Sequence, residues 1–225
     1  VGSWAAEALV RSGVGNLSLF DLDDICQSNL NRQLHALTTT IGQPKIEVMA
    51  QRLKLINPEA TLSTHHQFIT LNNLATSLTG YDVILDAIDD ASVKAGLIAW
   101  AKRNKQTLIV VGGAGGKQDP TQITSGDLAF TTQDPLLAKV RNLLRRNYGF
   151  AKASNQGKAK KFKVDCIYST EQLNWPQADG SVSPNKPKVE VTKLDCATGF
   201  GAATFVTGTF GFIAAQKAIA KLLNN

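Results

Sequence analysis

The 225-residue sequence predicts an α/β fold built around a doubly wound, mostly parallel sheet. Segments typical of strands and of helices alternate along residues 1–111, which is the order that places helices on both faces of a sheet. The segment Tyr81–Ala87 is a continuous β-branched and aliphatic run, as in a strand covered on both faces. Strand–helix–strand units of this kind cross over with one hand. We therefore expect a Rossmann-like sheet with a basic insert and a C-terminal extension.

The first helix is expected at Trp4–Arg11, an alanine-rich run that Gly13 can end as a C-cap. A helix that begins directly after a glycine usually follows a strand and a glycine turn. Only Gly2 of such a turn is seen before this helix. The first strand and the rest of the turn are therefore expected upstream of Val1.

The segment Gln43–Ile56 is the second expected helix, because Ile46, Met49 and Leu53 share one face and Asn57-Pro58 ends the pattern. The other elements follow from β-branched runs for strands and from helical spacing for helices. The expected strands are Leu17–Asp21, Thr61–His65, Tyr81–Ala87 and Thr107–Val111, and the further expected helices are Leu71–Leu78, Ser92–Asn104 and Pro135–Arg146.

The stretch Cys196–Gln216 contains no charged residue, and its length would suit a membrane helix. Its many glycine, alanine and threonine residues instead favour a buried helix preceded by a glycine-rich turn. Peripheral or single-span membrane association is the alternative.

Composition indicates a globular protein. The chain is 43% hydrophobic and 19% charged, an ordinary balance for a soluble domain, and its net charge of +6 favours an anionic partner. The three cysteines are odd in number and far apart, which excludes a disulfide framework and a paired Cys-x-x-Cys zinc site. A reducing, cytoplasmic compartment fits best. We expect a single domain over residues 1–225, with a basic insert at residues 134–190.

A candidate nucleotide site begins at Asp21. This acid ends a strand about 20 residues after the first turn, where an acid binds ribose hydroxyls in dinucleotide folds, although a solvated acid would have the same pattern. Backbone N–H groups at Gly2 would approach phosphates at a helix N-terminus.

Polar and cationic side chains follow Asp21. Asn29, Arg32 and Gln33 fall within one turn of a short helix and can face the same way. Arg32 offers a planar cation for phosphate oxygens, and Lys45 offers a compact one. An exposed polar helix with an unrelated lysine nearby is the alternative, but the combination with Asp21 favours a phosphate site.

Asp89 and Asp90 follow the expected strand Tyr81–Ala87, at the edge where doubly wound sheets bind ligands. A carboxylate at this position can hold Mg²⁺ beside bound phosphates. The alternative is a helix N-cap, a role open to Asp90 and to Ser92.

Together, these motifs resemble the superfamily of ubiquitin-activating enzymes and their bacterial relatives ThiF and MoeB. The motifs are D-x-D, S-N-L-N-R-Q, G-Q-P-K and L-D-A-I-D-D. The resemblance spans Gly2 to about Gly116 and implies adenylation of a carboxylate with Mg-ATP. It implies that Asp21 binds ribose, that Asn29 and Arg32 approach the triphosphate, and that Lys45 binds phosphate. Asp89 would serve the magnesium ion, and the catalytic residues would be Arg32, Lys45 and Asp89.

The second half contains GGAGGKQDPTQI, DLAFTTQDPLLAKVR, VDCIYSTE and LDCATGFGAATFVTGTFGF. These runs resemble the family of tRNA threonylcarbamoyladenosine dehydratases, which activate a carboxylate beside the anticodon with ATP and close a ring. The resemblance also implies a homodimer, a monovalent cation (K⁺ or Na⁺) and cysteine-desulfurase or sulfur-acceptor partners. One alternative is adenylation of the C-terminus of a ubiquitin-like or sulfur-carrier protein, which the missing zinc cysteines disfavour. A non-catalytic nucleotide sensor is the other.

Two cysteines are candidates for a transient thioester. Cys166 and Cys196 would act as cysteines do in some relatives, but a small buried residue in a core turn is the favoured interpretation of both. His35 lies near the phosphate motifs and is expected to pack or to form a hydrogen bond.

An acid-free segment, Pro135–Val164, is the candidate tRNA-binding surface. Tyr148, Phe150 and Phe162 are interleaved among its cations, and aromatic rings can stack on unpaired bases while cations contact phosphates. Such charge runs are often only solvated surface, but their segregation beside an ATP site favours RNA. The nine cations are Lys139, Arg141, Arg145, Arg146, Lys152, Lys158, Lys160, Lys161 and Lys163.

Overall fold

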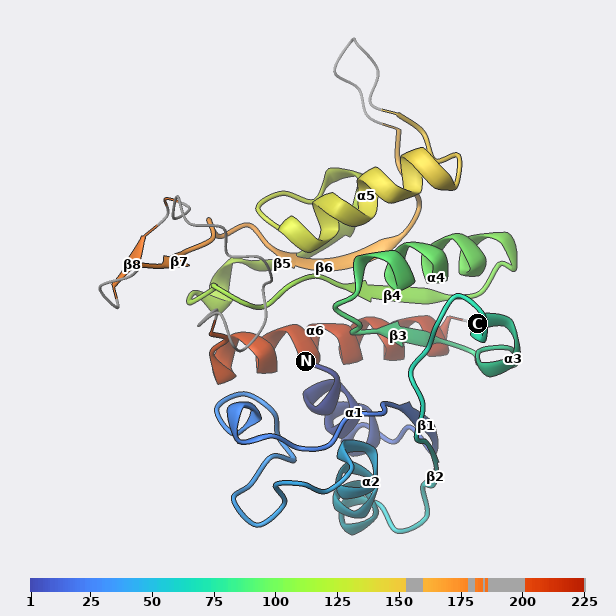
Figure 1. Ribbon diagram of the computed structural model, residues 1–225. Coiled ribbons are helices and arrows are strands. Elements are labelled where there is room, and N and C mark those ends of the chain that lie inside the picture. Colours follow the sequence, from blue (N-terminus) through green and yellow to red (C-terminus); the bar gives the residue numbers. More distant parts are fainter. Residues whose placement is uncertain (153–159, 178–180, 184, 186–200, 225) are drawn as a thin grey trace.

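The computed structural model describes residues 1–152, 160–177, 181–183, 185 and 201–224. Helices and strands alternate through its first half as the sequence predicts (Figure 1). The helices are α1 (Gly2–Arg11), α2 (Lys45–Ile56), α3 (Leu74–Ser77), α4 (Ala91–Arg103), α5 (Pro135–Asn147) and α6 (Thr204–Leu223). The strands are β1 (Asn16–Phe20), β2 (Thr61–His65), β3 (Ile84–Asp86), β4 (Leu108–Val111), β5 (Ile123–Asp127), β6 (Asp165–Ser169), β7 (Trp175–Pro176) and β8 (Val182–Ser183).

The central sheet has the order β3-β4-β6-β5. β3, β4 and β6 are parallel, while β5 runs antiparallel to β6, with Ser125 opposite Ile167. β1 and β2 form a separate parallel pair, and no ladder among the described residues joins β1 to β3. The predicted mostly parallel α/β fold is confirmed, whereas the antiparallel strand β5 was not predicted.

Helices cover both faces of the central sheet. α4 and α5 lie along one face, and α6 lies along the other with α1 beside it (Figure 1). The first face buries Val110, Leu137 and Phe162 in one cluster. The second buries Ile109 and Phe210 in another. Packing on both faces explains why the sequence around β3 and β4 forms continuous apolar runs.

α6 accounts for the described part of the uncharged stretch near the C-terminus. Its small residues face α1, because a Cβ on Gly211 would lie only 2.6 Å from Cβ of Trp4 and 2.9 Å from the backbone nitrogen of Ala5. The close approach of α1 therefore requires glycine there, as the prediction of a buried helix implies. Of the helices that the structure describes, none combines the length and apolarity needed to cross a bilayer.

Part of the segment 134–190, predicted as a basic insert, belongs to the core. β6 lies between β4 and β5, and Cys166 and Ile167 are buried in it. The strand escaped prediction because its five residues, DCIYS, carry neither alternation nor a long β-branched run.

Candidate active site

The predicted ribose acid, Asp21, directly follows β1 and is half-buried. Its carboxylate accepts a hydrogen bond of 2.9 Å from the backbone N–H of Asp23. Burial raises the pKa of Asp21, although the nearby Lys45 ammonium opposes this shift. The side chain is therefore held at the carboxyl end of the strand, beside a cation.

Lys45 begins α2 and faces the same acids. Its backbone N–H donates to the carbonyl of Asp23 at 3.1 Å, and its Nζ lies 2.7 Å from Oδ2 of Asp23. The Lys45 side chain is only 12% exposed. The structure thus brings together Asp21 and Lys45, which are far apart in sequence, and adds Asp23 as the ion-pair partner of the lysine.

Arg32 sits in a loop that two helices hold in place. Its backbone carbonyl accepts hydrogen bonds from Nε1 of Trp4 on α1 (3.0 Å) and from Oγ1 of Thr207 on α6 (3.1 Å). Its guanidinium donates to the carbonyl of Ser28 and to Oδ1 of Asn31 (3.1 Å). The backbone of this loop is therefore held by both helices, while the guanidinium of Arg32 donates to neighbouring residues of the loop.

Asn29 and Gln33 lie in the same loop as Arg32. Asn29 is 6% exposed, and its Oδ1 accepts a hydrogen bond of 3.1 Å from the backbone N–H of Cys26. The N–H of Gln33 donates to the carbonyl of Asn29 at 3.0 Å, in helical fashion. Asn29 therefore shapes the loop with its carbonyl oxygens, and its role toward ATP stays a prediction.

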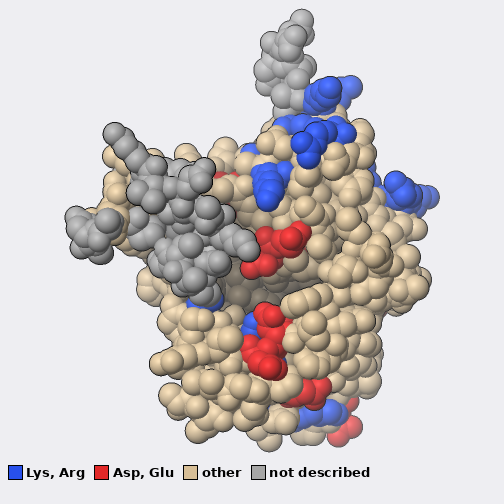
Figure 2. Space-filling view, in the orientation of Figure 1, with Lys and Arg blue, Asp and Glu red and all other residues tan. Residues whose placement is uncertain are grey.

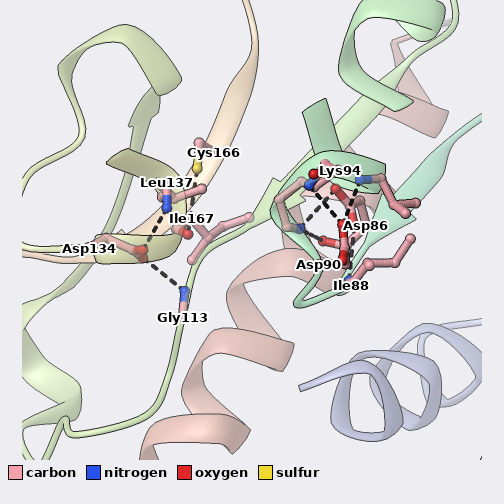
Figure 3. Close-up of polar contacts among 11 residues, drawn as sticks. Asp86, Ile88, Asp90, Lys94, Gly113, Asp134, Leu137, Cys166 and Ile167 are labelled. Atoms are coloured by element: carbon pink, nitrogen blue, oxygen red, sulfur yellow. Dashed lines mark hydrogen bonds and ion pairs between the residues drawn. The ribbon is translucent and has the colours of Figure 1, made fainter. Parts of the chain in front are cut away.

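The turn after β3 carries Asp89 between Ile88 and Asp90, which are labelled in Figure 3. Asp86, at the end of β3, is wholly buried, and its Oδ2 lies 2.9 Å from Nζ of Lys94, which is also wholly buried. Oδ1 of Asp86 accepts from the N–H of Ile88 at 2.9 Å. Asp89 itself is exposed. The buried ion pair thus fixes the near end of the turn that carries the predicted magnesium ligand.

Asp90 closes the far end of this turn as the N-cap of α4. Its Oδ1 accepts hydrogen bonds from the N–H groups of Ser92 (2.7 Å) and Val93 (2.8 Å). The sequence left a helix N-cap as the alternative role for Asp90, and in the structure Asp90 is the N-cap of α4. Gly2 approaches the same turn, since a Cβ on Gly2 would lie 3.8 Å from Cβ of Ala87.

The donor set suits magnesium supplied with a nucleotide. Within the described part of the chain, no group of three or more His, Cys, Asp or Glu side chains forms a metal cage. An exposed carboxylate such as Asp89 still fits Mg²⁺, which is commonly held by one or two carboxylates together with substrate phosphates.

Three buried ionic residues had no predicted role. Lys94 is wholly buried, and Lys117 and Asp134 are 2% and 4% exposed. Nζ of Lys117 donates to the carbonyl of Gln133 at 2.8 Å. The sequence does carry a signal for Asp134, because Asp followed by Pro is typical of a helix N-cap and first turn. Lys94 is recognisable only as a lysine among the apolar residues of α4.

Cys166 is a core residue on β6. Its side chain is wholly buried, and burial raises the pKa of its thiol far above the ordinary range. A buried thiol that stays protonated is a poor nucleophile, so the structure favours the core alternative for Cys166. Cys196 lies outside the described residues.

His35 is buried beside the phosphate motifs at 6% exposure, and neither ring nitrogen has a hydrogen-bond partner among the described residues. Burial, together with the positive charge of Lys45, lowers its pKa to about 4. His35 therefore packs in the core, which meets the expectation that it packs or forms a hydrogen bond.

The predicted tRNA surface divides into exposed and inward-facing residues. Figure 2 shows Lys and Arg gathered at the end of the molecule where α5 ends, with Asp and Glu grouped nearer the middle of the same face. Lys158 lies outside the described residues. The exposed cations are Lys139, Arg146, Lys152, Lys160, Lys161 and Lys163.

Two arginines of this surface turn toward the protein. Arg141 donates to Oγ1 of the buried Thr131, and burial lowers the pKa of its guanidinium. Arg145 lies 5.4 Å above the ring of Phe162. The prediction that these aromatic residues stack on bases is wrong for Phe162, which is 1% exposed and packs edge-on against Phe150. Phe150 and Phe162 therefore anchor the segment, and the six exposed cations remain outside.

Comparison with known proteins agrees with this geometry. The model of the ThiF family matches residues 1–225. The tRNA threonylcarbamoyladenosine dehydratase of Haemophilus influenzae is 51% identical over 224 residues, covering 99% of this chain and 82% of that protein. A crystal structure of the Escherichia coli tRNA N6-threonylcarbamoyladenosine dehydratase, TcdA, in complex with ATP is 46% identical, with a TM-score of 0.84, over 100% of this chain and 82% of that one.

A sulfur-carrier adenylating enzyme matches less of the chain. The molybdopterin-synthase adenylyltransferase of Escherichia coli is 35% identical over 109 residues, which is 48% of this chain and 44% of that protein. The similarity to the dehydratases instead continues through the second half, where α5 and β6 lie. The chain therefore belongs to the ThiF family and, within it, to the tRNA threonylcarbamoyladenosine dehydratases.

Proposed function

We propose that this protein uses ATP to dehydrate threonylcarbamoyladenosine next to the tRNA anticodon, giving the cyclic base. The observation that carries the proposal is the combination of two surfaces in one domain. Acids and a cation suited to Mg-ATP follow the carboxyl end of β1, where Lys45 lies 2.7 Å from Asp23, and the exposed Asp89 follows the carboxyl end of β3. Exposed cations gather where α5 ends, near the loop that holds Phe162 (Figure 2).

The site residues divide the work of binding ATP. Asp21 accepts hydrogen bonds from the ribose hydroxyls, and the N–H groups at Gly2 face the phosphates. Arg32 and Lys45 neutralise the charge that develops as pyrophosphate leaves. Asp89 would hold Mg²⁺, which supplies further charge neutralisation at the phosphates. Asn29 and Gln33 support Arg32 within its loop.

The chemistry needs positioning more than it needs a protein nucleophile. An oxygen of the substrate carboxylate attacks the α-phosphorus of ATP, and pyrophosphate leaves. The ureido group of the same side chain then attacks the activated carbonyl carbon, loses its proton and expels AMP. The net change in the base is the loss of one water. Intramolecular attack has a large effective-molarity advantage once the groups are aligned, so Cys196 is not required as a thioester carrier.

Finer features of the assembly are part of the same proposal. We infer a cytoplasmic homodimer that uses Mg²⁺ and a monovalent cation and works with cysteine-desulfurase or sulfur-acceptor partners, as the family resemblance implies. Two exposed phenylalanines of α6, Phe205 (56%) and Phe212 (52%), support an interface with a second copy.

One assay separates this function from its alternatives. The protein is incubated with Mg-ATP and tRNA from a strain that lacks the cyclic base, and the nucleosides are analysed by mass. Loss of one water from threonylcarbamoyladenosine, with AMP formed in step, is expected. Unchanged nucleosides, with AMP formed only when a ubiquitin-like or sulfur-carrier protein is added, would replace this proposal with carrier-protein adenylation. ATP binding without AMP formation in either case would indicate a nucleotide sensor.

A further inference from the structure

The buried carboxylate of Asp134 joins α5, the helix of the predicted tRNA surface, to the central sheet (Figure 3). Its Oδ1 accepts a hydrogen bond of 2.9 Å from the N–H of Leu137 and so caps α5. Its Oδ2 accepts one of 2.8 Å from the N–H of Gly113, the second residue after β4. Asp134 is 4% exposed. A helix cap needs only the first of these bonds, so the second calls for a separate explanation.

The glycine loop, residues Gly112–Gly116, is built around this carboxylate. A Cβ on Gly112 would lie 2.2 Å from Oδ2 of Asp134, so a side chain there would displace the carboxylate. At the other end of the loop, Lys117 donates to the carbonyl of Gln133 at 2.8 Å. The loop is therefore tied at both ends to Gln133-Asp134, the two residues that precede α5.

The glycine loop also borders the nucleotide side of the molecule. It leaves the carboxyl end of β4, the strand paired with β3, and β3 ends at Asp86 in the turn that presents Asp89. Burial raises the pKa of Asp134, and the hydrogen bonds from Leu137 and Gly113 oppose this shift more than the charges of Lys117 and Lys94 do. At its far end the loop meets residue 201, since the N–H of Gly116 donates to the carbonyl of Gly201 at 2.9 Å.

We propose that Asp134 is a positioning residue that couples tRNA binding on α5 to the glycine loop, and so aligns the modified base with the bound nucleotide. This inference rests on the proposed function. When cations at the end of α5 engage the RNA backbone, the helix and its cap are held in one place. Because the same carboxylate holds Gly113, the loop beside the nucleotide is fixed with them.

The variant Asp134→Ser separates this role from simple capping of α5. A serine hydroxyl is a good N-cap for α5, but a single oxygen on Cβ cannot also reach Gly113. Asp134→Asn is the second variant: its amide oxygen can accept from Leu137, which leaves an N–H₂ group against the Gly113 N–H. Asp119→Ser is the matched control, because Asp119 caps the short turn Pro120–Gln122 and makes no bond to the glycine loop.

The test combines single-turnover dehydration with amide hydrogen exchange, and it measures tRNA and ATP affinity for every variant. In wild type, bound tRNA should slow exchange in residues 112–116 as well as in α5. Asp134→Ser and Asp134→Asn should lose the protection in the loop and slow dehydration about tenfold or more. Their tRNA and ATP affinities should stay within about twofold of wild type, because the binding cations remain. The control should match wild type in all four measurements.

Two results would overturn the proposal. If tRNA binding does not slow exchange in the glycine loop of the wild-type protein, α5 and the loop are not coupled. Variants that keep both the protection and the dehydration rate would reduce Asp134 to a helix cap. The exchange measurement does not depend on turnover, so it judges the coupling even if wild type fails to dehydrate the base, an outcome that would count against the proposed function alone.

Discussion

The proposed nucleotide site and the proposed RNA-facing surface, which consists of the exposed cations of the segment Pro135–Val164, are built in opposite ways. At the nucleotide site, fixed contacts hold two of the proposed residues: two helices donate to the backbone carbonyl of Arg32, and Lys45 pairs with Asp23 at 2.7 Å. On the RNA-facing surface, exposed cations such as Lys139, Lys160 and Lys161 form no ion pair within the described part of the chain. The underside of the segment is fixed, since Phe162 is buried and its backbone N–H donates to Oδ1 of Asp127 at 2.9 Å.

This difference matches the two ligands. A small nucleotide about to react must be held in one geometry, since misplacement is costly. An RNA backbone is bound mainly by charge, in which each cation adds a similar increment. A single substitution at the nucleotide site should therefore remove most of the dehydration activity. A single substitution on the RNA-facing surface should lower the tRNA affinity by a small amount, and such losses should add.

The largest effect is expected from breaking the Asp86–Lys94 pair beneath the turn of Asp89. Lys94→Met should lower the free energy of unfolding by about 3–5 kcal/mol, because it leaves a wholly buried carboxylate without its cation. Urea unfolding measures the loss. Adding Asp86→Asn should recover much of it, because the amide is neutral. A loss below about 1 kcal/mol would show that water or another cation compensates Asp86.

The next largest effect is expected on the dehydration rate, from single substitutions at the nucleotide site. Arg32→Ala and Lys45→Ala should each slow dehydration about 100-fold or more, since each removes a cation aimed at the developing phosphate charge. Single-turnover rates measure this, with circular dichroism to verify the fold. Arg52→Ala is the control, because its guanidinium pairs with Glu7 on α1 rather than with the nucleotide site. A normal rate in either variant would remove that residue from the site.

His35 gives the nucleotide site a pH-dependent stability. Its pKa of about 4 in the folded protein lies below the ordinary 6.5, so the unfolded chain binds the proton first as pH falls. The contribution of the neutral ring is complete above about pH 6.5 and is lost as pH falls toward 4, amounting to about 2–3 kcal/mol. His35→Leu should flatten this part of the stability curve in urea titrations. An unchanged slope would show that other groups cause it.

The contrast between the two regions also explains which residues and strands could be predicted from the sequence. Asp21 and Asp89 follow the strands β1 and β3, and Arg32 and Lys45 stand in short motifs, so local pattern alone could point to these four residues. β5 was missed because its residues, ITSGD, form a strand through pairing with β6, about 40 residues away, and not through local pattern. A charge run likewise does not reveal which face is covered, so Arg141 and Phe162 were assigned to the wrong side.

Small, additive effects are expected on the RNA-facing surface. Arg146→Ala, Lys160→Ala and Lys161→Ala should each weaken tRNA binding by less than about tenfold and lower the slope of log affinity against log salt by about 1. Filter binding over a salt series measures both. Lys54→Ala, an exposed lysine of α2, should leave the slope unchanged. A single variant that abolished binding would show that this surface also depends on fixed geometry.

The smallest effect is expected at Cys166, which lies on β6 between the two regions. Cys166→Ala should change dehydration by less than about twofold, because a wholly buried thiol with a raised pKa supplies no thiolate, and it should cost about 1 kcal/mol of stability. Cys196→Ala, measured in parallel, should also stay active, since ring closure needs no protein nucleophile. Loss of activity in the folded Cys166→Ala variant would instead make β6 part of the chemistry. Loss in Cys196→Ala alone would leave β6 as core and assign a covalent step to the segment that precedes α6.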